Sequence, residues 1–344
     1  MVSPRDIFGE CSSKPTRRRF LATAAGLAAA ATLPGAALSQ TGPREKWRIG
    51  TPLFKADSMF QNMGVRKGFF AEEGIDAEIV GLESSATITR AVLSGELEMG
   101  SGGANSPIVA IARGATMKMI GSVFARVPHL MYARTDIRTP KDLEGKNVGG
   151  AQPGALLQQL AYASLQASGV DLKRVKFVNT GGSPNTFQAV VAGLVQAGVA
   201  GSEYALTLKA DPKIQVHVLY SVGEKLPLFL RNADFVSDAL IEKKRDLAVR
   251  ATRAYVKGMR YALANKDEAV AWAVDVAKVE RDVAEAVYQE YVENNFVNSP
   301  YTISNGQIEF TQKVNIETGA QAKLFSYDAM VNTEIAKEAL ASLK

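Results

Sequence analysis

The chain has 344 residues, of which 47% are hydrophobic and 22% are charged. That composition supplies enough apolar surface for two ordinary globular domains, and it excludes a disordered tail or a small disulfide-stapled scaffold. The formal net charge of +5 weakly favours a nucleic-acid partner. The charge has to be counted again, however, without the signal-like start of the chain.

The first 40 residues have the pattern of an export signal. Residues 16–21 read TRRRFL, and no charged residue occurs from Phe20 to Gln40, where an Ala-rich stretch contains two glycines and a proline. This pattern predicts a twin-arginine signal peptide over residues 1–39, although Thr16 and Ala22 depart from the usual serine and lysine. The alternative is a membrane anchor, because about 20 apolar residues span a bilayer. The alanines and the turn-forming residues favour export.

Removal of the predicted signal changes the charge and the thiol content. Residues 1–39 hold five basic and two acidic residues, so the net charge falls from +5 by three to +2. The only cysteine, Cys11, is lost as well, which leaves no disulfide and no cysteine nucleophile. No cysteine stands at the end of the signal for lipid attachment. We therefore expect a soluble periplasmic protein without a nucleic-acid partner.

The first part of the mature chain alternates short strands with amphipathic helices, which predicts an α/β domain with a mostly parallel sheet. Strands are expected at residues 47–52, 76–82, 97–100 and 117–124, and helices at about 59–71, 86–93 and 107–113.

A further strand is expected at residues 129–133, and after it the pattern starts again and predicts a second, smaller α/β unit. The strands of this unit are expected at residues 146–149, 175–179, 197–200 and 215–220, and its helices at 139–145, 154–168 and 184–194. From Ser237 on, apolar residues recur at spacings of three and four, which predicts an almost wholly helical tail. We expect this tail to cover the first lobe and its hinge side.

Five predicted strand-to-helix turns are rich in small polar residues: residues 83–85, 102–107, 152–155, 181–184 and 201–203. Open α/β sheets place ligands at the carboxyl ends of their strands, and helix N-termini offer unpaired N–H groups there. Each turn taken alone is explained equally well as a good helix start. Five of them favour a pocket for an anionic or strongly polar small molecule.

Motifs for catalysis or cofactors are incomplete. Near Gly100–Asn105, the glycine patterns of dinucleotide-binding proteins and of serine hydrolases each lack a required residue. Near Gly145–Asn147, the phosphate-loop pattern lacks one as well. The two histidines, His129 and His217, are far apart in sequence, and no cluster has metal-ligand spacing. We expect no cofactor, no metal and no enzymatic activity. The basic residues at 243–253 indicate a solvated helix face or, alternatively, a surface that docks on a permease.

Several motifs together resemble the SsuA-like family, the periplasmic solute-binding proteins of ABC importers for nitrate, sulfonates, taurine and thiamine-type pyrimidines. They are GFFAEEGIDAEIV at 68–80, AVLSGELEMGSGG at 91–103, ARGATMKMIGS at 112–122, TPKDLEGKNVGG at 139–150 and FQAVVAGLVQAGV at 187–199. The resemblance covers nearly all of residues 45–344.

The resemblance implies a type II periplasmic binding protein with two α/β lobes, two hinge crossings and a ligand held in the cleft. The crossings are expected near residues 133–136 and 220–223, so that the first lobe comprises 45–133 plus 223–344 and the second 134–222. It further implies a monomer that delivers its small-molecule ligand to an inner-membrane permease and ATPase.

Carried over position by position, the family's cleft loops imply the following ligand-binding residues: Lys55, Asp57, Ser84, Ala104, Asn105, Gln152, Gly154, Ala155, Gly182, Ser202 and Glu203. Ala155 replaces a serine that is frequent in the family, which argues against a simple sulfonate or nitrate clamp. Ser202-Glu203-Tyr204 stands where Trp-Glu-Pro is common. The retained carboxylate of Glu203 favours an organic ligand with an acidic part and a donor or apolar part, such as a sulfonate, a carboxylate or a pyrimidine.

Two other functions stay open at this point. Relatives with the same fold include enzymes of thiamine-pyrimidine synthesis, but these use a cysteine-rich stretch that the mature chain lacks. A binding protein that presents its ligand to a sensor or a secondary transporter is the other alternative.

Overall fold

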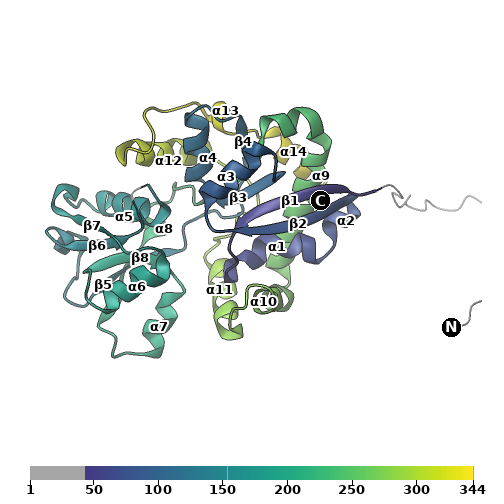
Figure 1. Ribbon diagram of the computed structural model, residues 1–344. Coiled ribbons are helices and arrows are strands. Elements are labelled where there is room, and N and C mark those ends of the chain that lie inside the picture. The colour runs from purple at the N-terminus through teal and green to yellow at the C-terminus, as the bar shows by residue number, and fades with distance from the viewer. Residues whose placement is uncertain (1–42, 153, 344) are drawn as a thin grey trace, which may run out of the picture. The chain divides into compact units, whose positions relative to one another are not determined.

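The computed structural model describes residues 43–152 and 154–343 (Figure 1). The predicted signal peptide over residues 1–39, including Cys11, lies outside the described residues. The described part belongs to one unit of the chain, which is built on two five-stranded sheets flanked by helices. Each sheet defines one lobe.

The first sheet has the strand order β2-β1-β3-β10-β4. Strand β1 pairs in parallel with β2 and β3, whereas β10 runs antiparallel to both β3 and β4. The strands are β1 Glu45–Pro52, β2 Ile75–Leu82, β3 Met99–Gly103, β4 Met117–Gly121 and β10 Asn232–Ser237. The sheet is therefore parallel except for one strand, β10, which the sequence patterns did not predict.

The second sheet repeats this plan with the order β7-β6-β8-β5-β9. Strand β6 is parallel to β7 and β8, and β5 is antiparallel to β8 and β9. The strands are β5 His129–Arg134, β6 Asn147–Gly150, β7 Lys176–Asn179, β8 Ala197–Gly201 and β9 Val216–Ser221. Both sheets thus consist of parallel strands with one antiparallel strand inserted next to the edge.

The strand over 129–134 differs from our assignment to the first lobe. Because β5 forms its hydrogen bonds with β8 and β9, it belongs to the second sheet. The chain passes between the sheets at residues 122–128 and returns at residues 222–231. We accordingly propose that the first lobe comprises residues 43–121 plus 232–343 and the second lobe residues 129–221.

Helices of the first lobe follow the expected positions closely: η1 Ala56–Ser58, α1 Met59–Arg66, α2 Phe69–Glu72, α3 Ser85–Ser94 and α4 Asn105–Ala112. The single helix predicted over 59–71 is divided at Gly68, whose φ of 76° lies in the left-handed region that ends a helix.

Helices of the second lobe are η2 Pro140–Leu143, α5 Leu156–Ala167, η3 Leu172–Arg174, α6 Ser183–Val191, α7 Tyr204–Ala210 and α8 Val222–Lys225. The short helix η2 begins as the sequence predicts, because Thr139 and Asp142 form a reciprocal capping box and a proline occupies the first turn. Apolar residues from α5 and the sheet form the main core of this lobe.

The tail after β10 is helical, as predicted: α9 Asp238–Ala264, α10 Lys266–Asp275, α11 Arg281–Glu293, α12 Asn305–Glu317, α13 Tyr327–Met330 and α14 Glu334–Ala341. Helices α9, α10, α11 and α14 pack on the first lobe in one apolar cluster. Helix α12 also reaches the second lobe, where the Asn315 Oδ1 atom accepts a hydrogen bond from Gln159 Nε2 at 2.6 Å. The tail therefore joins the two lobes as well as covering the first.

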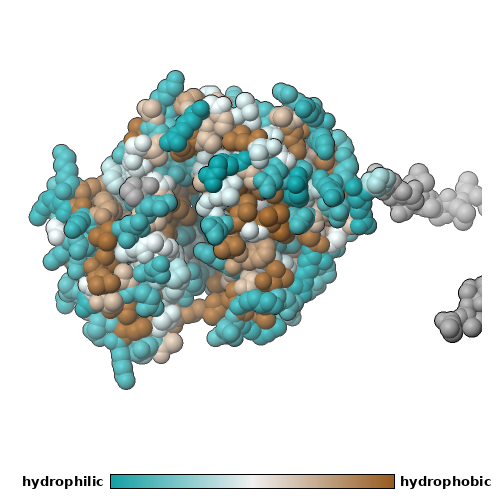
Figure 2. Space-filling model, in the orientation of Figure 1, coloured by the Kyte–Doolittle hydropathy of each residue, from teal (hydrophilic) through white to brown (hydrophobic). Residues whose placement is uncertain are grey.

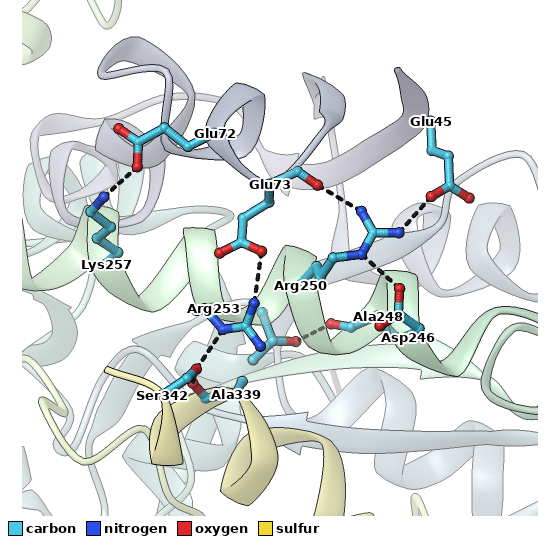
Figure 3. A network of polar contacts seen from close by, with 11 residues as sticks. Glu45, Glu72, Glu73, Asp246, Ala248, Arg250, Arg253, Lys257, Ala339 and Ser342 are labelled. Atoms are coloured by element: carbon cyan, nitrogen blue, oxygen red, sulfur yellow. Dashed lines mark hydrogen bonds and ion pairs between the residues drawn. The ribbon is translucent and has the colours of Figure 1, made fainter. Parts of the chain in front are cut away.

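The basic face of α9 is engaged in ion pairs with the first lobe (Figure 3). Arg250 pairs with Glu45 and with Asp246, and it donates to the Glu73 carbonyl oxygen at 2.7 Å. Arg253 pairs with the Glu73 carboxylate. These side chains attach α9 to β1 and α2, so this part of the basic stretch is neither a simple solvated face nor available for docking. Among the described helices, none is long and apolar enough to cross a membrane.

Candidate functional site

Two cavities lie where residues of both lobes approach one another, and the surface is hollowed between the lobes in Figure 2. The larger, which we call the groove, has a volume of about 980 Å³ and is lined by residues from α3, α4, the start of α5 and residues 318–320. The smaller, which we call the inner cavity, has a volume of about 320 Å³ and is lined by residues 54–57, 128–129, 183–184, 201, 203–204, 231 and 279 and by residues of α11.

The predicted site residues are divided between these cavities. Lys55, Asp57 and Glu203 line the inner cavity. Five others line the groove: Ser84, Asn105, Gln152, Gly154 and Ala155. Three predicted residues line neither: Ala104 is fully buried, Ser202 is buried beside the inner cavity, and Gly182 is exposed. The eleven residues therefore do not form one site.

Several polar groups of the groove are already used within the protein. The Ser84 hydroxyl accepts from the Thr87 amide at 3.2 Å and so caps α3. The Gly103 amide donates to Ser85 Oγ at 2.9 Å. The Asn105 Nδ2 atom donates to the Gly154 carbonyl oxygen at 2.9 Å, which links the lobes across the groove. For these turns, helix capping and interlobe contact account for the small polar residues.

Gly154 has to be glycine at this interlobe contact. Its φ is 80°, in the left-handed region that other residues rarely adopt, and its carbonyl oxygen is the one that Asn105 reaches. The turn at 152–155 thus contributes a backbone acceptor to the link between the lobes, rather than a set of free donors for a ligand.

The floor of the inner cavity is formed by an ion pair between Arg231 and Asp57. Their side chains are only 15% and 14% exposed, and Tyr291 donates its hydroxyl to the same Asp57 oxygen at 3.1 Å. Burial alone would raise the pKa of the Asp57 carboxyl, but the Arg231 charge and hydrogen bond lower that pKa below its ordinary value. Asp57 is therefore a carboxylate whose charge Arg231 balances.

His129 contributes a neutral imidazole to the inner cavity. Burial lowers its pKa from 6.5 to about 3, and the positive charges of Arg231 and Lys55 act in the same direction. Its Nδ1 atom is buried and has no hydrogen-bond partner among the described residues. At neutral pH the ring offers one donor and one acceptor nitrogen to a polar group nearby.

Glu203 lies at the start of α7, on the second-lobe side of the inner cavity. Burial raises the pKa of its carboxyl above the ordinary value. The neighbouring Ser202 hydroxyl donates to Glu290 Oε2 of α11 at 2.7 Å, a second hydrogen bond between the lobes. Two acidic side chains thus stand where the second lobe meets α11.

The remaining wall of the inner cavity is apolar and aromatic. Val279, Val283 and Val287 come from the segment around α11, and Tyr204 comes from the second lobe, where its ring stacks on Phe187 with 4.8 Å between centroids. A cavity with a charged floor and an apolar wall suits a small organic molecule with a polar end and a flat body.

Sequence reasoning missed several residues of this cavity, above all Arg231, Tyr291 and the valines of α11. Arg231 stands directly after the apolar run LPLFL at 226–230, a pattern that marks a buried segment without indicating a ligand. Among the described residues, no group of three or more histidine, cysteine, aspartate or glutamate side chains is placed to hold a metal ion.

Two α/β lobes with a cavity between them define the class of fold: the chain has the fold of the periplasmic binding proteins. The crystal structure of the periplasmic aliphatic sulphonate binding protein SsuA from Escherichia coli superposes with a TM-score of 0.70 at 16% identity, covering 84% of this chain and 92% of that one.

The chain belongs to the NMT1/THI5-like family, whose pattern matches residues 57–269. YtlA of Bacillus subtilis is 22% identical over 302 residues, which cover 83% of this chain and 85% of that protein. The formylaminopyrimidine-binding protein of Halalkalibacterium halodurans is 26% identical over 220 residues, or 61% of this chain and 64% of that protein. These findings confirm the family and the fold that the sequence motifs indicate.

Proposed function

We propose that the protein is exported to the periplasm, captures a small organic solute in the inner cavity between its lobes, and delivers it to an ABC permease in the inner membrane. The observation that carries the proposal is the composition of that cavity. Both lobes contribute to it, and a buried ion pair, a neutral histidine and an acid lie opposite an aromatic and apolar wall.

The ligand class follows from the same chemistry. A bare inorganic anion would gain nothing from the carboxyl of Glu203 or from the valines of α11, whereas an organic molecule with an acidic group and a flat body would use both ends of the cavity. The names of two similar proteins support this class, because one binds a pyrimidine and the other aliphatic sulphonates. Binding and delivery, rather than catalysis, agree with those names.

The inner cavity is favoured over the groove because its lining holds a buried ion pair and more unpaired polar atoms. Arg231 Nη1 and His129 Nδ1 are buried without a hydrogen bond among the described residues, whereas the groove lining contributes Asn105 Oδ1 alone. A buried donor or acceptor that stays unpaired is destabilising by about 1–3 kcal/mol, and a ligand that pairs with it recovers that energy.

A ligand screen combined with two variants tests the proposal. Protein freed of carried-over ligand by denaturation and refolding is screened by thermal shift against sulfonates, nitrate, carboxylates and pyrimidines, and the best compound is titrated by calorimetry. We expect Glu203→Gln to weaken its affinity about 10-fold or more, because the carboxylate accepts a charge-assisted hydrogen bond from the donor part of the ligand. Gln152→Ala, on the exposed rim of the groove, should leave the affinity unchanged.

The opposite pattern, with Gln152→Ala harmful and Glu203→Gln silent, would move the ligand to the groove. A screen in which no organic compound raises the unfolding temperature would contradict the proposed function itself.

A further inference from the structure

Arg231 lies where the chain returns from the second lobe to the first. It ends the connection at residues 222–231 through which the chain returns from the second lobe, and it directly precedes β10 in the first sheet. Its neighbour Asn232 accepts hydrogen bonds from the Val123 amide at 3.0 Å and from Ser122 Oγ at 3.1 Å, both in the outgoing connection. The two connections between the lobes therefore meet beside Arg231.

The Arg231 guanidinium is fixed on two sides. Its Nη2 atom donates to Asp57, and its central carbon lies 4.1 Å from the centroid of the Phe124 ring. Phe124 belongs to the outgoing connection, so a cation–π contact joins the two connections here as well. A planar side chain held in this way has one orientation toward the inner cavity.

One edge of the guanidinium has no partner. Arg231 lines the inner cavity, and its buried Nη1 atom forms no hydrogen bond among the described residues. Lys55 lines the same cavity and forms no ion pair among the described residues. The lining thus holds two basic side chains, Arg231 and Lys55, and two acidic ones, Asp57 and Glu203, of which Asp57 pairs with Arg231. Because the unpaired Nη1 donor belongs to a cation, a negatively charged acceptor forms the strongest hydrogen bond with it.

We propose that Arg231 is the specificity-determining residue of this cavity, and that it binds an oxyanion group of the ligand, a carboxylate or a sulfonate, through Nη1. The flat body of the ligand then lies against Tyr204 and the valines of α11. This inference rests on the proposed function, because it takes the inner cavity as the ligand site. It adds that Arg231 holds the acid group of the ligand, at the place where both interlobe connections meet.

Matched pairs of small probes test the inference, whatever the natural ligand is. Nicotinate is compared with nicotinamide, and benzenesulfonate with benzenesulfonamide, by titration calorimetry on the refolded full-length mature protein. We expect the acid of at least one pair to bind about 10- to 100-fold more tightly than its amide, the range of one charge-assisted hydrogen bond. Arg231→Gln should abolish this preference for the acid over its amide.

Two further variants make the result interpretable. Arg231→Lys keeps the charge without the planar fork, and we expect it to retain part of the preference for the acid. Arg250→Gln removes an arginine of the α9 network, remote from the cavity lining, and should retain all of it. If Arg231→Gln does not fold, the wild-type pairs and Arg231→Lys still decide the question.

Equal binding of acid and amide by the wild-type protein, an undiminished preference in Arg231→Gln, or failure of every acid to bind would overturn the inference. If the broader screen still finds an organic ligand in that case, the proposed function stands and only the role of Arg231 falls. If the screen finds none, both fail.

Discussion

Asp234 is a buried acid in the core of the first lobe. It lies on β10, it is fully buried, and neither carboxyl oxygen has a hydrogen-bond partner among the described residues. Burial raises its pKa from 3.8 to about 7, against the opposing effect of the nearby Ser101, Tyr301 and Asn232 side chains. The folded protein therefore holds a proton on Asp234 in a pH range where the unfolded chain has lost it.

The pH dependence of stability follows from this difference. Because the folded state binds more protons between about pH 4 and pH 7, the contribution of Asp234 to the free energy of unfolding falls as the pH rises through that range. We expect Asp234→Asn to remove this slope. In urea unfolding, the stability of the variant relative to wild type should increase by about 2 to 3 kcal/mol from about pH 5 to pH 8. A constant difference between the two proteins would show that Asp234 does not titrate in this range.

At the scale of residues, part of the site could be predicted from the sequence. Lys55, Asp57 and Glu203 follow strands at the expected turns, and all three line the inner cavity. Arg231 was missed because its partner Asp57 is 174 residues away, and no local pattern reports such a pair. The groove residues were predicted for the same reason as the cavity residues, because they lie in turns rich in small polar residues. Helix caps have the same composition, so the pattern does not separate a cap from a ligand site.

Among the elements, the contact between α1 and α9 depends on two glycines. A Cβ atom on Gly258 of α9 would lie 2.2 Å from the Gly64 nitrogen of α1, and a Cβ atom on Gly64 would lie 2.9 Å from the Ala254 carbonyl oxygen. Both obstacles are backbone atoms, which cannot move aside as a flexible side chain does. The two helices approach this closely only because neither residue has a side chain.

Gly258→Ala should therefore destabilise the protein by about 3 kcal/mol or more, despite the better helix propensity of alanine. Gly306→Ala in the first turn of α12 is the matched control, because its Cβ atom would meet nothing closer than 3.8 Å. We expect the control to be neutral or slightly stabilising. Chemical unfolding of both variants is the measurement, and equal stabilities would contradict the packing described for α1 and α9.

Most elements agree with their predicted positions because their sequence patterns are local. Apolar residues recur every two positions in strands and every three to four in helices, and many helices have a capping residue at the start and a glycine at the end. The exceptions depend on distant partners. Strand β10 pairs with β3 and β4, whose residues lie more than 100 positions away in the chain. The sheet to which β5 belongs is decided by β8 and β9, which follow it in the chain.

For the whole molecule, three side-chain hydrogen bonds join the lobes within the described part of the chain: Asn105 with Gly154, Ser202 with Glu290, and Gln159 with Asn315. The first two stand at the groove and beside the inner cavity, and the third joins α5 to α12. A ligand that fills the inner cavity adds contacts to both lobes and so favours the arrangement in which they are close. The central claim of the account is thus a ligand position.

That position is measured most directly by a crystal structure of the protein with the tightest compound from the screen. We predict that the compound lies in the inner cavity, with its polar end at Arg231 and its body between Tyr204 and α11, in contact with both lobes. A compound bound in the groove, or on one lobe alone, would contradict the account.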